Sequence, residues 1–221
     1  MLIIIMNENV AEMIGLFLGD GCLSRYFSKY NKKWISVLLF TGNLQNDKEY
    51  YESILRPIIL KFFKTKGYMR YRVDDNTIRY FIFNKNLINY LIEIGFRFGS
   101  KTNSCRIPDS IFNDKRLRIA CVRGIFNADG TVYRRYRKKY KNQPRFYGNY
   151  AVIQFKMKSK VLIEQIRYIL QNDDFVVNKI SKVENYFLIR ITNQKYVNRF
   201  FKEIAINHPY HLTRYADIKN S

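Results

Sequence analysis

The sequence predicts an α+β protein built from two similar units, each with the order helix, two strands, helix, two strands, helix (αββαββα). Three observations lead to this prediction. An apolar helical stretch that ends in Asp-Gly occurs twice, at residues 11–21 and 120–130. Each copy is followed by a similar succession of amphipathic helices and β-rich hairpins. A constant offset of 109 residues relates the two copies and still holds near the end of each half, which indicates an internal duplication.

Each copy of the repeated stretch predicts an apolar helix closed by a glycine, the usual residue for a left-handed turn after a helix end. The acid before each glycine, Asp20 in the first copy and Asp129 in the second, is unexpected there. A carboxylate at a helix C-terminus faces the negative end of the macrodipole, at a cost of about 0.3–1 kcal/mol when exposed. Two such acids at matching places therefore indicate a bound cation.

The same stretch predicts how the two helices meet. An alanine and a glycine four residues apart, Ala11 and Gly15 in the first copy, leave one helix face nearly flat. Two flat faces allow close backbone approach, and helices crossing in this way would bring Asp20 and Asp129 together. Because two adjacent carboxylates repel each other, metal ions are expected between them, as in two-metal nucleases. The alternative is a pair of buried structural helices with solvated terminal acids.

Composition indicates a folded protein with a cationic surface. The 221 residues include 39 Lys and Arg against 18 Asp and Glu, a formal charge of +21, and 47% of the residues are hydrophobic. This excludes a disordered basic tail and favours nucleic acid as the partner. A membrane surface is not expected, because the basic residues fall on predicted strands. Three cysteines without a CxxC pair predict reduced thiols in an intracellular protein and no zinc site.

Local patterns place the elements of the first half. Asn9 and Glu12 have the spacing of a capping box for the first helix, and Pro57 should kink the second. The expected elements after the first motif are two strands over 22–45, a helix from Asp47, a hairpin over 67–83 with its turn at 74–76, and a short helix over 87–94.

The second half repeats this plan after a loop rich in Gly, Ser and Asn. The expected elements are a long basic hairpin over 131–158, a helix over 159–171, a hairpin over 174–192 and a helix over 195–206, with His208 and His211 capping the last helix. The domain prediction is a first half-domain at 1–100, a linker at 101–113 and a second half-domain at 114–221.

Residues 13–21 and 122–130 resemble the two signature motifs of the LAGLIDADG homing endonucleases, and residues 101–108 resemble the segment that precedes the second motif in archaeal and intein-borne members. Leu18 and Asn127 replace the first aspartate of the motif, which is not the catalytic one. The resemblance implies two pseudo-twofold-related units in one chain, whose sheets form a DNA-binding saddle with the helices packed behind.

The resemblance also implies an intron-encoded homing endonuclease, monomeric, that hydrolyses a phosphodiester bond in each strand of double-stranded DNA at a long recognition site. Asp20 and Asp129 would bind Mg²⁺ or Mn²⁺ with the backbone carbonyls of Gly19 and Ala128, and Ca²⁺ would be a non-catalytic substitute. Lys101 matches the basic residue of the family that assists the attacking water or the transition state. No lysine occupies the equivalent place in the second half, so the two strand-cutting sites should differ in rate.

All four predicted hairpins carry excess cations, and two-stranded ribbons fit the major groove of DNA. A solvated charged surface is the alternative. The predicted DNA-binding residues are Arg25, Lys29, Lys32, Lys33, Arg70, Arg72, Arg79, Arg134, Arg135, Arg137, Lys138, Lys139, Arg145, Lys156, Lys179, Lys182 and Arg190.

Two other functions remain open. The first is a maturase of the same fold that binds intron RNA and assists splicing, although two retained acids argue against a loss of cleavage. The second is a non-catalytic DNA-binding regulator, which usually carries an added helix-turn-helix for which few residues remain. An intein is not expected, because the chain begins Met1-Leu2 and ends Lys219-Asn220-Ser221, without splicing residues.

Overall fold

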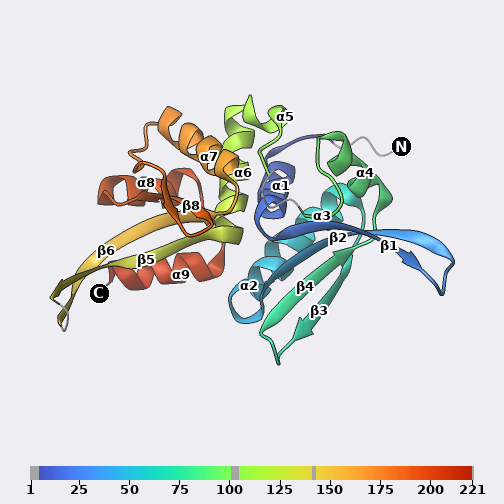
Figure 1. Ribbon diagram of the computed structural model, residues 1–221, viewed down its shortest axis with the longest axis horizontal. Helices are drawn as coiled ribbons and strands as arrows, with labels where there is room; N and C mark the ends of the chain where they lie inside the picture. The colour runs from blue at the N-terminus through green and yellow to red at the C-terminus, as the bar shows by residue number, and fades with distance from the viewer. Residues whose placement is uncertain (1–4, 101–104, 141–142, 221) are drawn as a thin grey trace. The chain divides into compact units, whose positions relative to one another are not determined.

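The computed structural model describes residues 5–100, 105–140 and 143–220, with side chains described outside 136–149 (Figure 1). The described elements are, in order, α1 (Glu8–Asp20), β1 (Gly21–Ser28), β2 (Lys33–Asn43), α2 (Leu44–Tyr50), the π-helical turn η1 (Tyr51–Leu55), α3 (Arg56–Phe63), β3 (Tyr68–Arg72), β4 (Thr77–Ile82), α4 (Lys85–Glu93), α5 (Asp109–Phe112), α6 (Lys115–Asp129), β5 (Gly130–Tyr140), β6 (Gln143–Met157), α7 (Lys160–Asn172), β7 (Ser181–Val183), β8 (Tyr186–Ile191), α8 (Gln194–Glu203) and α9 (Pro209–Lys219).

Two four-stranded antiparallel sheets form the framework of these elements. Their strand orders are β1-β2-β4-β3 and β5-β6-β8-β7, so each sheet consists of two hairpins joined through their second strands. The two sheets have the same order of connections, and a motif helix leads directly into the first strand of each. The predicted α+β class with two similar halves is therefore confirmed.

The chain divides into two compact units, Met1–Ala128 and Asp129–Ser221. All of α6 except its last residue, Asp129, thus belongs to the first unit, because the helix packs against α1. The predicted linker is not a continuous loop, since the short helix α5 occupies part of it. The predicted half-domain boundaries stay a prediction.

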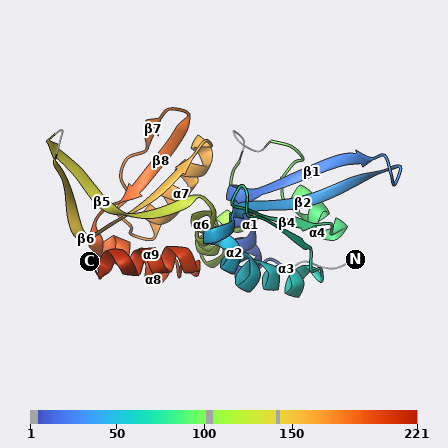
Figure 2. The same ribbon diagram turned by 90° about the horizontal axis from the view of Figure 1, so that it is seen from below.

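One face of the first sheet is covered by helices. Ile78, Tyr80 and Ile82 alternate along β4 and are fully buried, and their partners in β2 include Phe40 and Leu38, which are buried as well. Figure 2 shows α3 and α4 on the same side of the β1–β2 hairpin. The intervening residues of β4 point to the opposite face and are only partly buried. This alternation assigns every strand residue of the sheet to one of two faces.

The second helix of the first half differs from its prediction. It begins at Leu44 rather than Asp47, because the Asn43 side chain accepts a hydrogen bond from the Asn46 amide and caps the helix. Asp47 instead accepts from the Asn43 amide at 2.6 Å. The π-helical turn at 51–55 lies just before Pro57, which has no amide hydrogen to donate to the preceding turn.

The second unit repeats the register of the first. Gly130 pairs with Phe155 as Gly21 pairs with Phe40, but the hairpin between them is longer. The helix that follows, α7, is shorter than the combined α2–η1–α3 segment, so the offset of 109 is restored at β8. Asn84 and Asn193, related by that offset, both cap their helices through the side chain.

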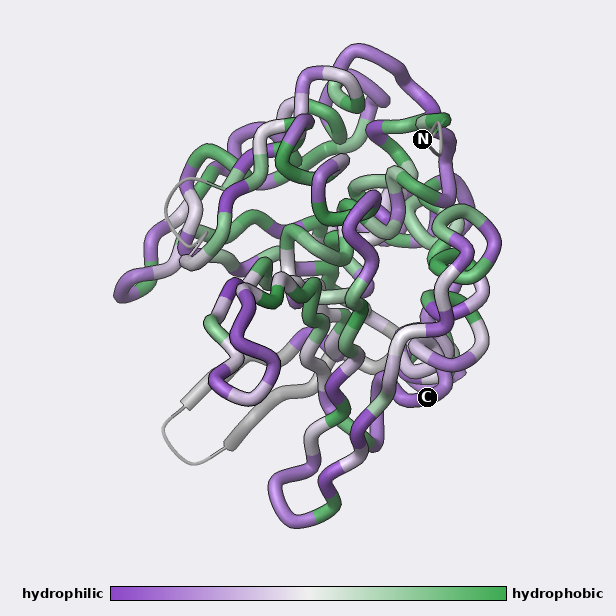
Figure 3. Tube along the Cα trace, turned by 90° about the vertical axis from the view of Figure 1, so that its right-hand side faces the viewer, coloured by the Kyte–Doolittle hydropathy of each residue, from purple (hydrophilic) through white to green (hydrophobic). Residues whose placement is uncertain are grey.

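Two predictions for the second unit are wrong at its ends. Residues 174–180 are not part of a strand, and β7 is only three residues long. The chain continues beyond the predicted plan into α9, which contacts β5 and β6. His208 occupies the N-cap position of this unpredicted helix without a side-chain capping bond, and His211 lies inside it. In Figure 3 hydrophilic residues predominate at the hairpin turns.

None of the helices within the described ranges is long and apolar enough to cross a membrane.

Candidate functional site

The two motif helices pack through their glycines, as the sequence predicts. A Cβ on Gly15 would clash with the carbonyl oxygen of Cys121 and lie 2.9 Å from the Ile125 nitrogen. A Cβ on Gly124 would clash with the carbonyl oxygen of Glu12 and lie 2.8 Å from the Leu16 nitrogen. The offset of 109 converts the first pair of contacts into the second, so the helices α1 and α6 meet with local twofold pseudosymmetry.

Each motif helix runs directly into a strand at its acid. Asp20 is the last residue of α1 and is partly buried, as is Gly19. Gly21 begins β1 with φ −84° and ψ 154°, so the predicted left-handed turn is wrong. Glycine is required there for space, since a Cβ would lie 2.6 Å from Cα of Phe17. Asp129 ends α6 in the same way, before β5.

The Tyr51 hydroxyl lies beside Asp20 within the first unit. Burial, together with the negative charges of Asp20 and Asp47, raises the pKa of Tyr51 well above its usual range. The hydroxyl therefore stays protonated and offers a hydrogen-bond donor toward the acid. Gly42 makes room for this arrangement, because a Cβ there would lie 2.9 Å from the Tyr51 hydroxyl and 2.5 Å from Oδ2 of Asp47.

The donors at the helix ends fit a hard divalent cation. A carboxylate and the last carbonyl groups of a helix supply only oxygen ligands, at the negative end of the helix dipole. Across the described ranges no group of three or more His, Cys, Asp or Glu side chains could enclose a metal. An ion bound at Asp20 would thus need further ligands from water or from an anionic substrate, which is typical of Mg²⁺.

A buried polar cluster at the contact between α1 and α6 was not predicted. Glu12 is 1% exposed and accepts from Nε of Arg123 at 2.8 Å and from the Tyr50 hydroxyl at 3.0 Å. Asn127 donates to the same carboxylate at 3.4 Å. The predicted capping box of Asn9 and Glu12 is therefore wrong, and the Asn7 side chain caps α1 instead. The sequence did contain a signal for this cluster, because Glu12 and Arg123 are charged residues inside two otherwise apolar helices.

The first sheet carries arginines on the face opposite its helices. By strand alternation Arg70, Arg72 and Arg79 share this face, which we call the cationic face. Arg70 and Arg79 stand directly opposite each other on neighbouring strands. Two like charges in that position destabilise a sheet. The Nε atom of Arg79 also has no hydrogen-bond acceptor among the described residues.

Arg72 differs from the other two arginines because the β3–β4 turn neutralises it. Its guanidinium forms ion pairs with Asp74 at 3.0 Å and Asp75 at 3.1 Å. The bond to Arg72 lowers the pKa of Asp74. A phosphate approaching Arg72 would compete with these acids.

The second sheet also carries described cations on the corresponding face. Lys156 and Arg190 lie there, on the face opposite the buried residues Phe155, Ile189 and Ile191 and beside the buried Leu188, which pairs with Lys156. Nε of Arg190 donates to Gln154 at 2.8 Å, and Nζ of Lys156 lies 4.7 Å from the ring centre of Tyr186.

Other predicted DNA-binding residues lie away from this face. Arg25 shares the helix-covered side with the buried Leu23 and lies over the ring of Trp34. In the second sheet Arg134 pairs with buried Ala151, and Lys182 lies over Phe187. Lys29 and Lys32 lie in the first turn and Lys179 lies before β7, whereas Arg135, over the ring of Tyr150, lies at the register shift of β5. The side chains of Arg137, Lys138, Lys139 and Arg145, and the whole of Lys101, lie outside the described residues.

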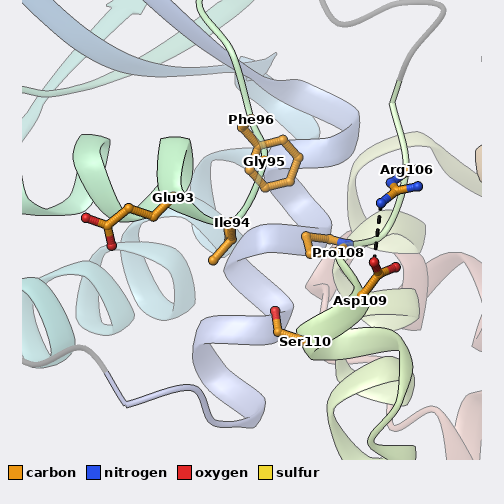
Figure 4. Close-up of a pocket in the computed structure, with 8 residues that line it drawn as sticks. All are labelled: Glu93, Ile94, Gly95, Phe96, Arg106, Pro108, Asp109 and Ser110. Carbon is orange, nitrogen blue, oxygen red and sulfur yellow. Dashed lines mark hydrogen bonds and ion pairs between the residues drawn. The ribbon is translucent and has the colours of Figure 1, made fainter.

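Two surface pockets in the first unit lie away from the motif acids. The first, of about 420 Å³, lies between the end of α4 and α5, with an exposed ion pair of Arg106 and Asp109 at its rim (Figure 4). The second, of about 780 Å³, lies between the β1–β2 hairpin and α4 and includes Arg25, Lys33 and Trp34. Asp20 lines neither pocket.

Comparisons with known proteins agree with this architecture. Residues 116–205 match a family model described as a LAGLIDADG-like domain. The chain is 24% identical over 217 residues to a replication factor C small subunit of Methanocaldococcus jannaschii; the match covers 96% of this chain and 10% of that protein's length.

Solved structures of homing endonucleases share the fold. The structure of I-DmoI in complex with DNA and Mn superposes with a TM-score of 0.63 at 18% identity, covering 91% of this chain and 98% of that one. I-AabMI bound to uncleaved DNA gives 0.61 at 13% identity, covering 97% and 91%. I-SmaMI bound to an uncleaved DNA target with calcium ions gives 0.61 at 10% identity, covering 98% of both chains.

These findings confirm the resemblance to the LAGLIDADG homing endonucleases. Residues 116–205 match the LAGLIDADG-like domain model, and the chain shares the fold of these homing endonuclease structures over more than nine tenths of its length.

Proposed function

We propose that this protein is a site-specific DNA endonuclease that hydrolyses one phosphodiester bond in each strand of double-stranded DNA. The observation that carries the proposal is the pseudosymmetric contact of Gly15 and Gly124, which joins two helices that each end in an aspartate. A duplicated pair of acids suits a substrate with two antiparallel strands, because each acid can serve one strand. We further propose that it acts as a monomer inside the cell, at a long site, as an intron-encoded homing endonuclease.

In this proposal Asp20 and Asp129 hold divalent ions, Mg²⁺ or Mn²⁺, with the carbonyl groups of Gly19 and Ala128, and Ca²⁺ supports binding without cutting. Such an ion supplies an activated water and neutralises the charge that develops on the leaving oxygen. The Tyr51 hydroxyl, kept protonated by burial and by the charges of Asp20 and Asp47, lies beside Asp20 as a hydrogen-bond donor. The glycine contact fixes the spacing of α1 and α6, the two helices that end in these acids.

The cationic face supplies the phosphate contacts. Arg70 and Arg79 repel each other in the free protein, and a phosphate group between them removes that repulsion. The repulsion between the two arginines lowers the folding stability and at the same time creates a site for an anion, which is typical of binding surfaces. Lys156 and Arg190 supply phosphate contacts on the second sheet, where Lys156 pairs with Leu188 and Arg190 with Gln154.

The test is cleavage of a plasmid library that carries randomised inserts, with Mg²⁺ or Mn²⁺, followed by sequencing of the cut ends. We expect a single long recognition sequence, with one break in each strand. The Asp20→Asn, Asp129→Asn double variant is the matched control, since it keeps the shape and removes both carboxylates. Cutting by this variant, or an absence of cutting by the parent at any sequence, would contradict the proposal.

A further inference from the structure

The cluster at the α1–α6 contact is one-sided, unlike the glycine packing around it. The offset of 109 relates the polar residues Glu12, Arg123 and Asn127 to the apolar or weakly polar residues Cys121, Ile14 and Leu18. The mirrored position of the contact therefore holds no ion pair. A motif helix pair that is symmetric in its backbone packing is thus asymmetric in its buried charge.

The anchor of this cluster is Glu12, which is held by a residue outside α6 as well. Its side chain is 2% exposed and accepts from the Tyr50 hydroxyl of α2. Burial, followed by the charge of Glu12, raises the pKa of Tyr50 well above its usual range, so this donor keeps its proton. The carboxylate consequently has a fixed place on α1.

Helix α6 is held to Glu12 by two hydrogen-bond donors. Arg123 and Asn127 are four residues apart, hence on one face of α6, and both donate to Glu12. The Arg123 side chain is only 14% exposed, so its bond to Glu12 is weakly screened by solvent. Asn127 lies two residues before Asp129, the last residue of the helix.

We propose that Glu12, Arg123 and Asn127 are positioning residues, which fix the rotation of α6 on α1 and thereby the place of Asp129 more than that of Asp20. This rests on the proposed function, in which each acid serves one strand. Asp20 has its own neighbour in Tyr51, within the unit that carries Glu12. Loosening the cluster should therefore slow the cutting of one strand selectively.

The test compares strand-specific cutting in two variants. Glu12→Gln with Arg123→Met removes the buried charges together, so that neither remains unpaired, and leaves Tyr50 an acceptor. Val122→Ala removes packing from the same helix without touching the cluster, and Val122 is fully buried. The strand left intact by Asp129→Asn identifies the strand that Asp129 serves.

We expect the charge-free pair variant to bind DNA like the parent and to accumulate nicked DNA. Its uncut strand should be the one that Asp129→Asn leaves intact, with a loss of roughly 10- to 100-fold there, since a shift of about 1 Å can cost 10²-fold in rate. Val122→Ala should show no strand preference. Equal slowing of both strands, or the same preference in Val122→Ala, would overturn the inference.

Hydrogen exchange decides the same question without cleavage. In the charge-free pair variant, backbone amides 126–129 at the end of α6 should exchange faster, while amides 17–20 at the end of α1 should not. Unchanged protection of the α6 end would overturn the inference even if the protein cuts DNA. If the parent cuts no DNA, the proposed function fails, and the exchange result still decides what the cluster positions.

Discussion

Gly15 of α1 lies directly against the carbonyl group of Cys121 in α6, and no Cβ atom fits between them. The obstacle is a backbone group, which cannot rotate away as a side chain would. The mirrored contact of Gly124 with the Glu12 carbonyl has the same property. The two helices can therefore approach this closely only because Gly15 and Gly124 have no side chains.

Replacement of Gly15 by alanine should already destabilise the protein, and replacement by leucine should do so more strongly. The added atoms must push α6 away, which costs roughly 1–3 kcal/mol or more through overpacking. Urea unfolding measures the loss. Asn86→Leu in α4 is the matched control, because it adds a leucine at an exposed position that lines neither pocket. A Gly15→Leu protein that melts and cuts like the parent would contradict the close-packing argument.

DNA binding should weaken steeply with salt and should require one chain only. The formal charge of +21 attracts many phosphates, and the logarithm of affinity falls by roughly 0.9 per phosphate contact for each tenfold rise in salt. Titrations at several salt concentrations, with sedimentation of the complex, measure both properties. A flat salt response, or a dimer as the species that binds, would be evidence against this prediction.

Arg70→Gln should stabilise the free protein while weakening its hold on DNA. Removing one of two facing arginines relieves a cross-strand repulsion of about 0.2–1 kcal/mol. The same change removes one phosphate contact, so the salt slope should fall by roughly one. Arg106→Gln serves as the control, since Arg106 lies in the loop before α5, paired with Asp109. Lower folding stability together with unchanged DNA affinity would show that Arg70 is structural.

The parts of this protein that follow from local patterns were predictable from its sequence. Glycine at four-residue spacing from alanine predicts the close contact of α1 and α6, and hairpin patterns predict the described strands approximately, except for the short β7. Glu12 was misread because Asn9 and Glu12 have the spacing of a cap, whereas its actual partner Arg123 is 111 residues away. Local patterns carry no information about such a partner.

The sequence also did not show on which face of its sheet each charged strand residue lies. A charge on a strand lies on one of two sides, and only a neighbour of known burial says which. Arg25 follows the buried Leu23 by two residues and so lies on the helix side, whereas Arg70 and Arg79 lie on the other. Gly21 shows the same limit, since its need for glycine comes from Phe17 and not from its backbone angles.

Folding stability should fall as the pH rises above about 10. Burial raises the pKa of Tyr50 and Tyr51 well above the usual value, and raises that of Tyr80 to about 12. In this window the unfolded chain loses phenolic protons that the folded protein retains, so the unfolded state is favoured as the pH rises. Unfolding by urea at pH 9 and pH 11 measures the difference. Tyr51→Phe should reduce the loss, and a Tyr51→Phe protein with the parent's pH dependence would contradict this account.

Asp20 and Asp129 should be needed for cutting and not for binding. Asp→Asn conserves the shape of each side chain, removes a metal ligand and relieves repulsion between the acid and the phosphates. Affinity in metal-free buffer should therefore be unchanged or tighter, whereas hydrolysis of the corresponding strand should collapse. Each single variant should accumulate nicked plasmid, with opposite strands cut in the two, and the double variant should leave the plasmid supercoiled. Gel separation of supercoiled, nicked and linear forms, with end-labelled strands, distinguishes these products.

A loss of binding together with cutting would make the acids structural, as solvated ends of two buried helices. Full cutting by the double variant would mean that another group of side chains performs the chemistry on this fold.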